Sequence, residues 1–245
     1  LKLPSLTHQV RQQQREQYRK ELPPLSSQDL EIVRALQKEG TFITSIEELG
    51  ISNKTAFLKS IQTVFPELQT IPHHGDWSVR LSWRRKVQYP DILFWALAEQ
   101  LLDIVETYMG LPLLYHGADV RRDVANSPLT GPQQWHRDID DDRMVKLIVY
   151  LNDVDPEGGA FEYIPRPYTA ELTQALNYTS GYVADQAIAD IIPPEKWKTC
   201  TGLTGTVVIV DPRHVFHRAK PATTSDRVSI TFGFTSRKPK VNLNE

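Results

Sequence analysis

The chain has 245 residues, of which 40% are hydrophobic and 24% charged, enough for one large single-core domain or two small ones. Its 28 basic and 30 acidic residues give a net charge of −2, a balance that offers no sign of a nucleic-acid or membrane partner. Cys200 is its single cysteine, which excludes an intrachain disulfide and a cysteine-rich metal site. With neither a membrane-spanning apolar run nor the apolar segment of a secretory signal, we expect a cytoplasmic protein.

The first third of the chain predicts helices. Residues 7–22 are polar nearly all round, which is typical of a solvated or partner-facing helix. Ser26 suits the N-cap of a second helix, with Leu30, Val33 and Leu36 on one face and Gly40 after its end. Residues 53–65 predict a further short helix.

The clearest helix covers residues 90–109. Pro90 suits its first position and Gly110 its C-terminal end. An apolar stripe follows one face, formed by Leu93, Leu97, Leu101, Ile104, Val105 and Tyr108. A stripe this broad needs an apolar partner, most simply the outer face of a sheet.

After Gly110 the pattern changes to short strands separated by turn residues. We expect them at 111–124, 144–154, 160–164, 205–211, 214–218 and 227–235, with an insert at 166–198 that has helical pieces at 168–177 and 182–192. Helices followed by antiparallel strands indicate the α+β class: a double-sheet jelly roll, or double-stranded β-helix, with helices packed on one sheet. We therefore divide the chain into a mainly helical region, 1–110, on a barrel core, 111–245, within one domain overall.

Two of these strands alternate in polarity. In 227–235 the apolar residues Val228, Ile230, Phe232 and Phe234 lie opposite polar ones. In 146–152, the face of Leu147, Val149 and Leu151 lies opposite that of Lys146, Ile148, Tyr150 and Asn152. One wet face on an antiparallel sheet explains most such patterns. The helix at 90–109 favours the other arrangement, with the apolar face outward and a polar barrel interior.

A His-x-Asp pair, His136 and Asp138, carries the first sign of chemistry. On an extended segment both side chains point to one side, with Gln134 behind them. A surface histidine beside a surface aspartate is the commoner origin of so short a motif. His73 and His74 have no third partner at readable spacing, so a surface loop explains them better.

His217 follows Asp138 by 79 residues and is the best candidate for a second imidazole, because His214 would face the other side of that strand. Two histidines and a carboxylate form the facial triad of non-haem iron(II) oxygenases, which leaves coordination positions open. Arg227 follows ten residues later, with Ser229 on the same strand face. A guanidinium donates two parallel hydrogen bonds to a carboxylate, and a hydroxyl adds a third donor.

In combination, these motifs resemble the phytanoyl-CoA dioxygenase-like branch of the Fe(II)/2-oxoglutarate oxygenases, over residues 111–236. The resemblance is carried by 135–138, 146–154, 158–165, 211–221 and 227–229. It implies a double-stranded β-helix, Fe(2+) on His136, Asp138 and His217, and 2-oxoglutarate bound to that iron and to Arg227 and Ser229. Tyr150 matches a tyrosine that helps bind 2-oxoglutarate in the similar prolyl hydroxylase branch. Lys146 is a further candidate cation for a carboxylate, the alternative being a solvated lysine.

The resemblance implies hydroxylation, or a related desaturation, of an unactivated C–H bond in a small or medium-sized metabolite, with dioxygen consumed and succinate and CO2 released. Asp138 favours these outcomes over halogenation, because related halogenases lack the carboxylate. Two alternatives stay open: a protein or peptide hydroxylase of the prolyl type, and a non-catalytic jelly-roll binding module. Residues 165–168 depart from the usual Pro-Gly-Ser-His, so the substrate stays open, as does the oligomeric state.

Overall fold

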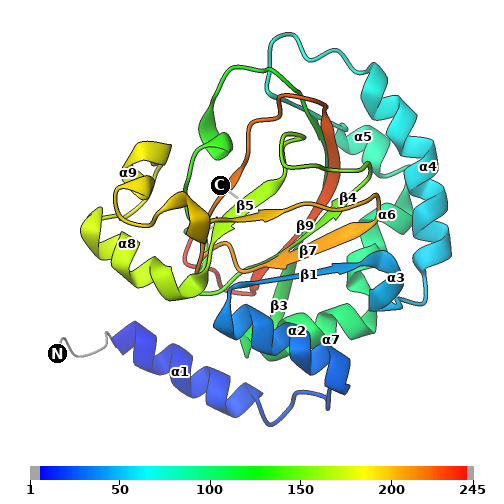
Figure 1. Cartoon of the computed structure of the whole chain (residues 1–245). Helices are drawn as coiled ribbons and strands as arrows, with labels where there is room; N and C mark the ends of the chain where they lie inside the picture. Colours follow the sequence, from blue (N-terminus) through cyan, green and yellow to red (C-terminus); the bar gives the residue numbers. More distant parts are fainter. Residues whose placement is uncertain (1–5, 242–245) are drawn as a thin grey trace.

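Two antiparallel sheets form the centre of the computed structural model, which describes residues 6–241 (Figure 1). The larger sheet has the order β1 (Thr41–Ser45), β7 (Thr206–Val210), β4 (Val145–Tyr150), β9 (Arg227–Ser236), β3 (Leu113–Asp123) and β2 (Ser78–Arg80). The smaller sheet has the order β6 (Lys198–Cys200), β5 (Phe161–Ile164) and β8 (Phe216–Ala219). The α+β class and the double-sheet architecture are therefore confirmed.

Among the described residues, six strands lie within four residues of the ends predicted for them, the largest difference being the end of β4 at Tyr150 instead of 154, and three strands were missed. The missed strands, β1, β2 and β6, are three to five residues long and too short to show a clear alternation. Two of them, β1 and β2, belong to the region predicted as mainly helical, yet they form the two edges of the larger sheet. The division at residue 110 stays a prediction, and its outer ends, residues 1–5 and 242–245, lie outside the described residues.

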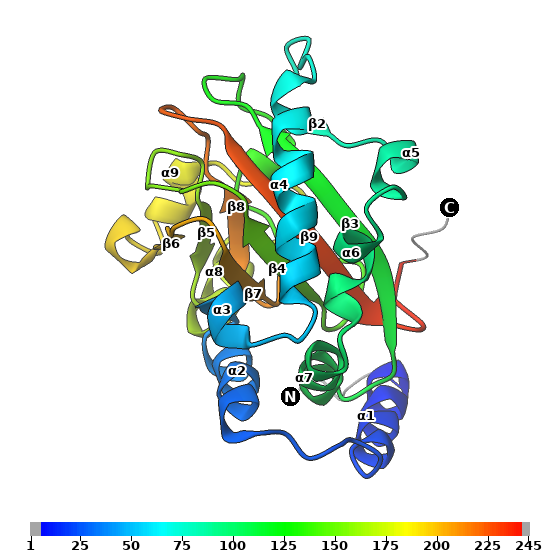
Figure 2. The same ribbon diagram turned by 90° about the vertical axis from the view of Figure 1, so that its right-hand side faces the viewer.

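Among the described residues, seven α-helices come before β3 in the chain. They are α1 (Leu6–Tyr18), α2 (Ser27–Lys38), α3 (Ile46–Leu49), α4 (Lys54–Thr70), α5 (Trp83–Lys86), α6 (Pro90–Phe94) and α7 (Glu99–Met109). Figure 2 shows α4 lying across one face of the larger sheet. Ser26 caps α2 as expected, because its hydroxyl accepts a hydrogen bond from Asp29 N.

The outer face of the larger sheet is apolar and covered by these helices, as the alternation predicted. Phe232 on β9 packs against Trp95 and Phe57, whose rings stack with centroids 4.5 Å apart. The opposite face of β9 carries Arg227 and Ser229 into the space between the two sheets, where both are buried. Because the helices shield the apolar side, the barrel interior is free to hold polar groups.

The prediction of one continuous helix over residues 90–109 is wrong. The helix α6 ends at Phe94, a 3-10 turn follows at Trp95–Leu97, and Ala98 is extended (ψ 134°) before α7 begins. Trp95 is fully buried between Phe57 and Phe232, so the chain changes direction there. Because the sheet is twisted, two short helices at an angle can both pack against its face, whereas one long straight helix would diverge from it.

The insert after β5 carries α8 (Thr169–Ala175) and α9 (Asp185–Ala189). Both lie on the side of the barrel away from α4 (Figure 1). They cover an apolar cluster that includes Trp135, Ile164, Leu172, Ile188 and Phe216. Among the described residues, no helix has the length and apolar character to cross a bilayer.

Candidate metal centre

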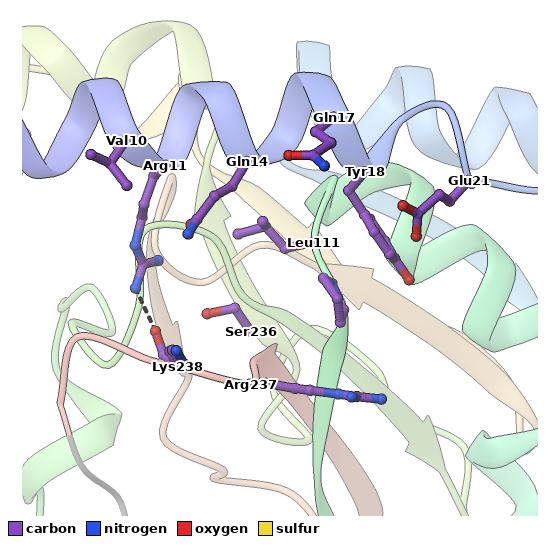
Figure 3. Close-up of a pocket in the computed structure, with 11 residues that line it drawn as sticks. Val10, Arg11, Gln14, Gln17, Tyr18, Glu21, Leu111, Ser236, Arg237 and Lys238 are labelled. Atoms are coloured by element: carbon purple, nitrogen blue, oxygen red, sulfur yellow. Dashed lines mark hydrogen bonds between the residues drawn. The ribbon is translucent and has the colours of Figure 1, made fainter.

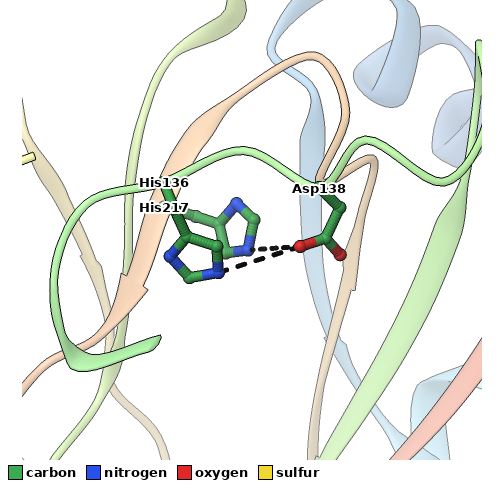
Figure 4. Close-up of side chains that lie close together, drawn as sticks. All are labelled: His136, Asp138 and His217. Atoms are coloured by element: carbon green, nitrogen blue, oxygen red, sulfur yellow. Dashed lines mark ion pairs between the residues drawn. The ribbon is translucent and has the colours of Figure 1, made fainter. Parts of the chain in front are cut away.

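The tertiary structure brings His136, Asp138 and His217 together (Figure 4). One potential ligand atom from each lies within 4.8 Å of the other two. The Nε2 atoms of both histidines are 3.7 Å from Asp138 Oδ1, and the two imidazole centroids are 4.3 Å apart. Two nitrogens and one carboxylate oxygen thus converge on a single point.

Backbone hydrogen bonds fix this arrangement. His136 N donates to His217 O at 3.0 Å, and His217 N donates to His136 O at 2.9 Å. Asp138 N donates to Pro212 O at 3.0 Å, on the approach to β8. The segment that carries the His-x-Asp pair therefore lies beside β8, and its extended conformation places both side chains on the barrel interior as predicted.

The ring orientation leaves the Nε2 atoms free to bind an ion. His136 Nδ1 contacts Gln134 O at 2.9 Å, and His217 Nδ1 lies 3.3 Å from Val215 O. A carbonyl acceptor at Nδ1 fixes the tautomer whose Nε2 lone pair is available, as metal-binding histidines require. Burial lowers the pKa of His217 to about 3 and also lowers that of His136, so both rings are neutral at pH 7.

Asp138 is shared between the histidines and Lys146. Its Oδ1 faces the two rings, while Lys146 Nζ lies 2.5 Å from Oδ2. Burial raises the pKa of this carboxyl, but the opposing effects of Lys146, the largest of them, and of the two histidines outweigh burial and bring the pKa to about 2. The carboxylate is therefore ionised at neutral pH, with one oxygen facing the two imidazoles.

This donor set fits a divalent first-row metal. Neutral imidazoles and one carboxylate on a single face are the ligands of mononuclear non-haem iron sites. His214 does not join the set, because its Nδ1 contacts Asp211 Oδ2 at 2.7 Å. His73 and His74 lie on an exposed loop, as expected.

Arg227 is the deepest cation of the site. It is 1% exposed, and Nε and Nη2 both donate to Asp123 Oδ2 on the neighbouring strand β3, the Nε bond at 3.1 Å. Burial lowers the pKa of Arg227, but Asp123 and Tyr150 together more than compensate and keep the pKa raised. The sequence indicated no carboxylate partner for this arginine.

Three buried donors beside this pair lack a hydrogen-bond partner among the described residues: Arg227 Nη1, Ser229 Oγ and Thr231 Oγ1. They follow one another on the inward face of β9. Buried polar atoms without partners are uncommon, and three donors on one strand face can be satisfied together by an acceptor from outside the protein. A carboxylate would satisfy them.

Tyr150 and Gln134 lie less directly at the site. The Tyr150 hydroxyl donates to Cys200 O at 2.8 Å and accepts from Phe161 N at 3.0 Å, so it joins β4 to the smaller sheet. That hydroxyl is thus already engaged, but it also interacts with Arg227, and Tyr150 lies opposite Ser229 in the register. Gln134 contributes its carbonyl to the His136 ring.

The triad and Arg227 line one cavity of about 500 Å³. Several other residues that line it were not predicted as site residues: Arg80, Lys86, Asp119, Arg121, Tyr182 and Thr231. The alternation Asp119-x-Arg121-x-Asp123 on β3 was the available signal, because alternate residues of a strand share one face.

A larger cavity of about 700 Å³ lies elsewhere, between α1 and the chain around Leu111 and Ser236 (Figure 3). Arg11 crosses it to contact Lys238 O and Asp141, the latter at 2.5 Å. Within residues 6–241, the part of the chain that the structure describes, no metal-ligand cluster lies in this cavity. The smaller cavity is the better candidate for the active site, because His136, Asp138 and His217 line it.

Solved structures with the same fold exist. The chain is similar to HygX from Streptomyces hygroscopicus with nickel, 2-oxoglutarate and hygromycin B bound, at 19% identity over 87% of this chain and 88% of that one (TM-score 0.55). It is also similar to SnoK, a non-haem α-ketoglutarate-dependent carbocyclase from nogalamycin biosynthesis, at 19% identity over 88% and 85% (TM-score 0.56). EctD from S. alaskensis, with 2-oxoglutarate and 5-hydroxyectoine, matches at 16% identity over 87% and 77% (TM-score 0.56).

These similarities confirm the predicted double-stranded β-helix fold. No family model matches the chain, and no curated protein matches it either. At identities below 20% the function has to be argued from the site itself.

Proposed function

We propose that this chain is an Fe(II)- and 2-oxoglutarate-dependent oxygenase that hydroxylates an unactivated C–H bond of a small or medium-sized metabolite, releasing succinate and CO2. One observation carries the proposal. The cavity that holds the His136, Asp138 and His217 cluster is also lined by Arg227 and Thr231, each with a donor that lacks a partner among the described residues, and Ser229 lies between them on β9. A 2-oxo acid with a second carboxylate fits this arrangement, because one end of the molecule can bind the metal while the other end binds the donors of β9.

The protein's own residues have distinct tasks in this reaction. His136, Asp138 and His217 would hold Fe(II) on one face and leave the opposite face free. When bound, the iron supplies the activation of dioxygen and the oxidation of the C–H bond. The neutral imidazoles bind through Nε2 because Nδ1 already faces a backbone carbonyl.

The far carboxylate of 2-oxoglutarate would lie against Arg227 Nη1, Ser229 Oγ and Thr231 Oγ1. Asp123 holds the other two guanidinium donors, which fixes the direction of Nη1. An arginine held on one side is preorganised, so little side-chain entropy is lost when the co-substrate binds. The apolar neighbours Ile148 and Phe161 line the same cavity and limit the access of water to the site.

The solved structures support the proposal through the molecules that they contain. HygX was solved with nickel and 2-oxoglutarate, and EctD with 2-oxoglutarate. Both proteins share the fold of this chain over more than four fifths of its length. The other molecules bound in these structures, hygromycin B and 5-hydroxyectoine, differ from one another, so the substrate of this protein has to be inferred from its own cavity.

The decisive experiment combines binding and turnover. Calorimetry with Ni(II)-loaded protein should detect 2-oxoglutarate, and Ser229→Ala should weaken it by about tenfold, the worth of one hydrogen bond to a charged group. Because Ser229 Oγ has no partner in the described structure, its removal should cost little folding stability. Ser225→Ala is the control, since that hydroxyl is exposed four residues away.

Turnover is tested with Fe(II), 2-oxoglutarate and oxygen, with succinate measured by mass spectrometry. We expect slow succinate release even without substrate, absent in His217→Ala. Unchanged 2-oxoglutarate affinity in Ser229→Ala would refute the co-substrate site. Intact binding with no succinate under any condition would identify a non-catalytic binding module instead.

A further inference from the structure

Side chains that the proposed reaction does not use line the outer part of the same cavity. Arg80 and Asp119 lie at its rim, with side chains 50% and 35% exposed. Lys86, at the end of α5, donates to Ala118 O at 2.9 Å. Arg121 lies deeper, with its side chain 15% exposed. These residues come from β2, β3 and α5.

The arginines and aspartates form a ladder of alternating charge. Arg227 pairs with Asp123, and Asp123 Oδ1 lies 3.3 Å from Arg121 Nε. Arg121 Nη1 lies 3.6 Å from Asp119 Oδ2, and Asp119 Oδ1 lies 3.2 Å from Arg80 Nε. The ladder runs from the buried floor of the cavity to its rim, and it begins and ends with an arginine.

The cavity therefore carries an excess of positive charge. Its cations are Arg80, Lys86, Arg121, Lys146 and Arg227, while Asp119, Asp123, Asp138 and Asp140 are the carboxylates on or beside them. Five against four leaves an excess of one. Burial lowers the pKa of His116, so this histidine adds no charge at neutral pH. A divalent metal and a dianionic co-substrate cancel each other, and the excess remains for the substrate.

The excess of positive charge lies at the mouth of the cavity, which is formed by Arg80, Lys86, Asp119 and Arg121. Lys146 is matched by Asp138 and also faces Asp140, and Arg227 is matched by Asp123. Lys86 has a backbone carbonyl as its hydrogen-bond acceptor among the described residues, which leaves its charge unneutralised. Arg121 and Arg80 share Asp119, so this part of the ladder also has one cation more than it has carboxylates.

We propose that the substrate is a small anion whose carboxylate or phosphate group binds Arg121, Arg80 and Lys86 while its reacting carbon faces the triad. The inference rests on the proposed function for the position of that carbon. Guanidinium groups at a partly desolvated mouth recognise carboxylate and phosphate by paired hydrogen bonds. A cavity of about 500 Å³ that also holds the co-substrate admits only a small metabolite.

The test is calorimetry on protein saturated with Ni(II) and 2-oxoglutarate. The probes are glycerol 3-phosphate and hexanoate, with glycerol and 1-hexanol as neutral counterparts of the same skeleton. We expect at least one anion to bind at least tenfold more tightly than its neutral counterpart. Arg121→Gln and Lys86→Met should each remove most of that preference. Arg84→Gln, an exposed arginine of α5 outside the cavity, should leave it unchanged.

Three outcomes separate the possible failures. Equal binding of anions and neutral probes overturns the inference, and so does an anion preference that survives both cavity variants, which would place the anion on the metal. A failure of 2-oxoglutarate to bind the Ni(II) protein would refute the proposed function alone. The same anion titrations on metal-free protein would then test the cation cluster by itself. Because Arg121 contacts Asp123, Lys86→Met serves as the variant with the smaller risk to folding.

Discussion

Lys146 Nζ lies 2.5 Å from Asp138 Oδ2, on the far side of the carboxylate from the two imidazoles. The two residues come from different segments: Lys146 from β4, and Asp138 from the stretch beside β8. The ammonium group pairs with Oδ2, the oxygen that faces away from the histidines, so only Oδ1 is directed toward the proposed metal position. We therefore infer that Lys146 positions Asp138 to bind a metal through one oxygen.

Removing this ammonium should change the coordination of the metal. In Lys146→Met, Oδ2 loses its partner, and we expect the carboxylate to turn and bind through both oxygens. The visible absorption spectrum of the Co(II)-substituted protein reports this change, because it depends on coordination number. Lys86→Met is the matched control, a lysine of the same cavity that does not contact Asp138. Identical spectra for wild type and Lys146→Met would show that Lys146 does not position the ligand.

Loss of one imidazole should nearly abolish metal binding. His217→Ala removes one of three ligands, and we expect the affinity for Fe(II) or Ni(II) to fall by more than about 100-fold, beyond the loss typical of groups behind the ligands. His116→Ala is the control, because His116 lines the cavity but contacts Thr235 Oγ1 at 2.7 Å. Equal losses in the two variants would exclude the triad as the metal site.

The pair of Asp123 and Arg227 should make folding stability sensitive to acid. Burial raises the pKa of Asp123, but Arg121 and Arg227 outweigh burial and lower it below its usual value. A carboxyl whose folded pKa is lowered contributes stability above its unfolded pKa of about 3.9, and the contribution is lost as the pH falls through the folded pKa.

Urea unfolding at pH 7 and near pH 3 measures this contribution. We expect Asp123→Asn to be less stable than wild type by several kcal/mol at pH 7, since it leaves the charge of Arg227 buried without its partner. The gap should narrow in acid, because the unfolded wild-type chain takes up a proton at Asp123 below its pKa of about 3.9, while the folded carboxylate stays ionised to lower pH. A gap of the same size at both pH values would contradict the assignment.

The contact between Phe57 and Trp95 should be a main source of stability for the helical cover. Phe57 is fully buried, and Phe57→Ala should cost about 3–5 kcal/mol of the free energy of unfolding. Phe94→Ala, at a residue 58% exposed, should cost less than about 1 kcal/mol. Equal losses in chemical denaturation would mean that α4 is not packed on the sheet as described.

The sequence by itself determined those features that depend on local periodicity. Alternation along a strand has a period of two, so the inward positions of Arg227, Ser229 and Lys146 could be assigned without a structure. The same rule placed His136 and Asp138 on one side of an extended segment. His217 was selected by its position on a later strand and by the resemblance, and the structure brings it to the same point.

Only the tertiary structure decided which of these side chains face one another. Asp123 lies opposite Arg227 because β3 and β9 pair in that register, across 104 residues of sequence. Register depends on turns and on the packing of both faces, and no local pattern encodes it. The charge excess at the cavity mouth arises in the same way, since β2, β3 and α5 each contribute to it and no one segment shows it alone.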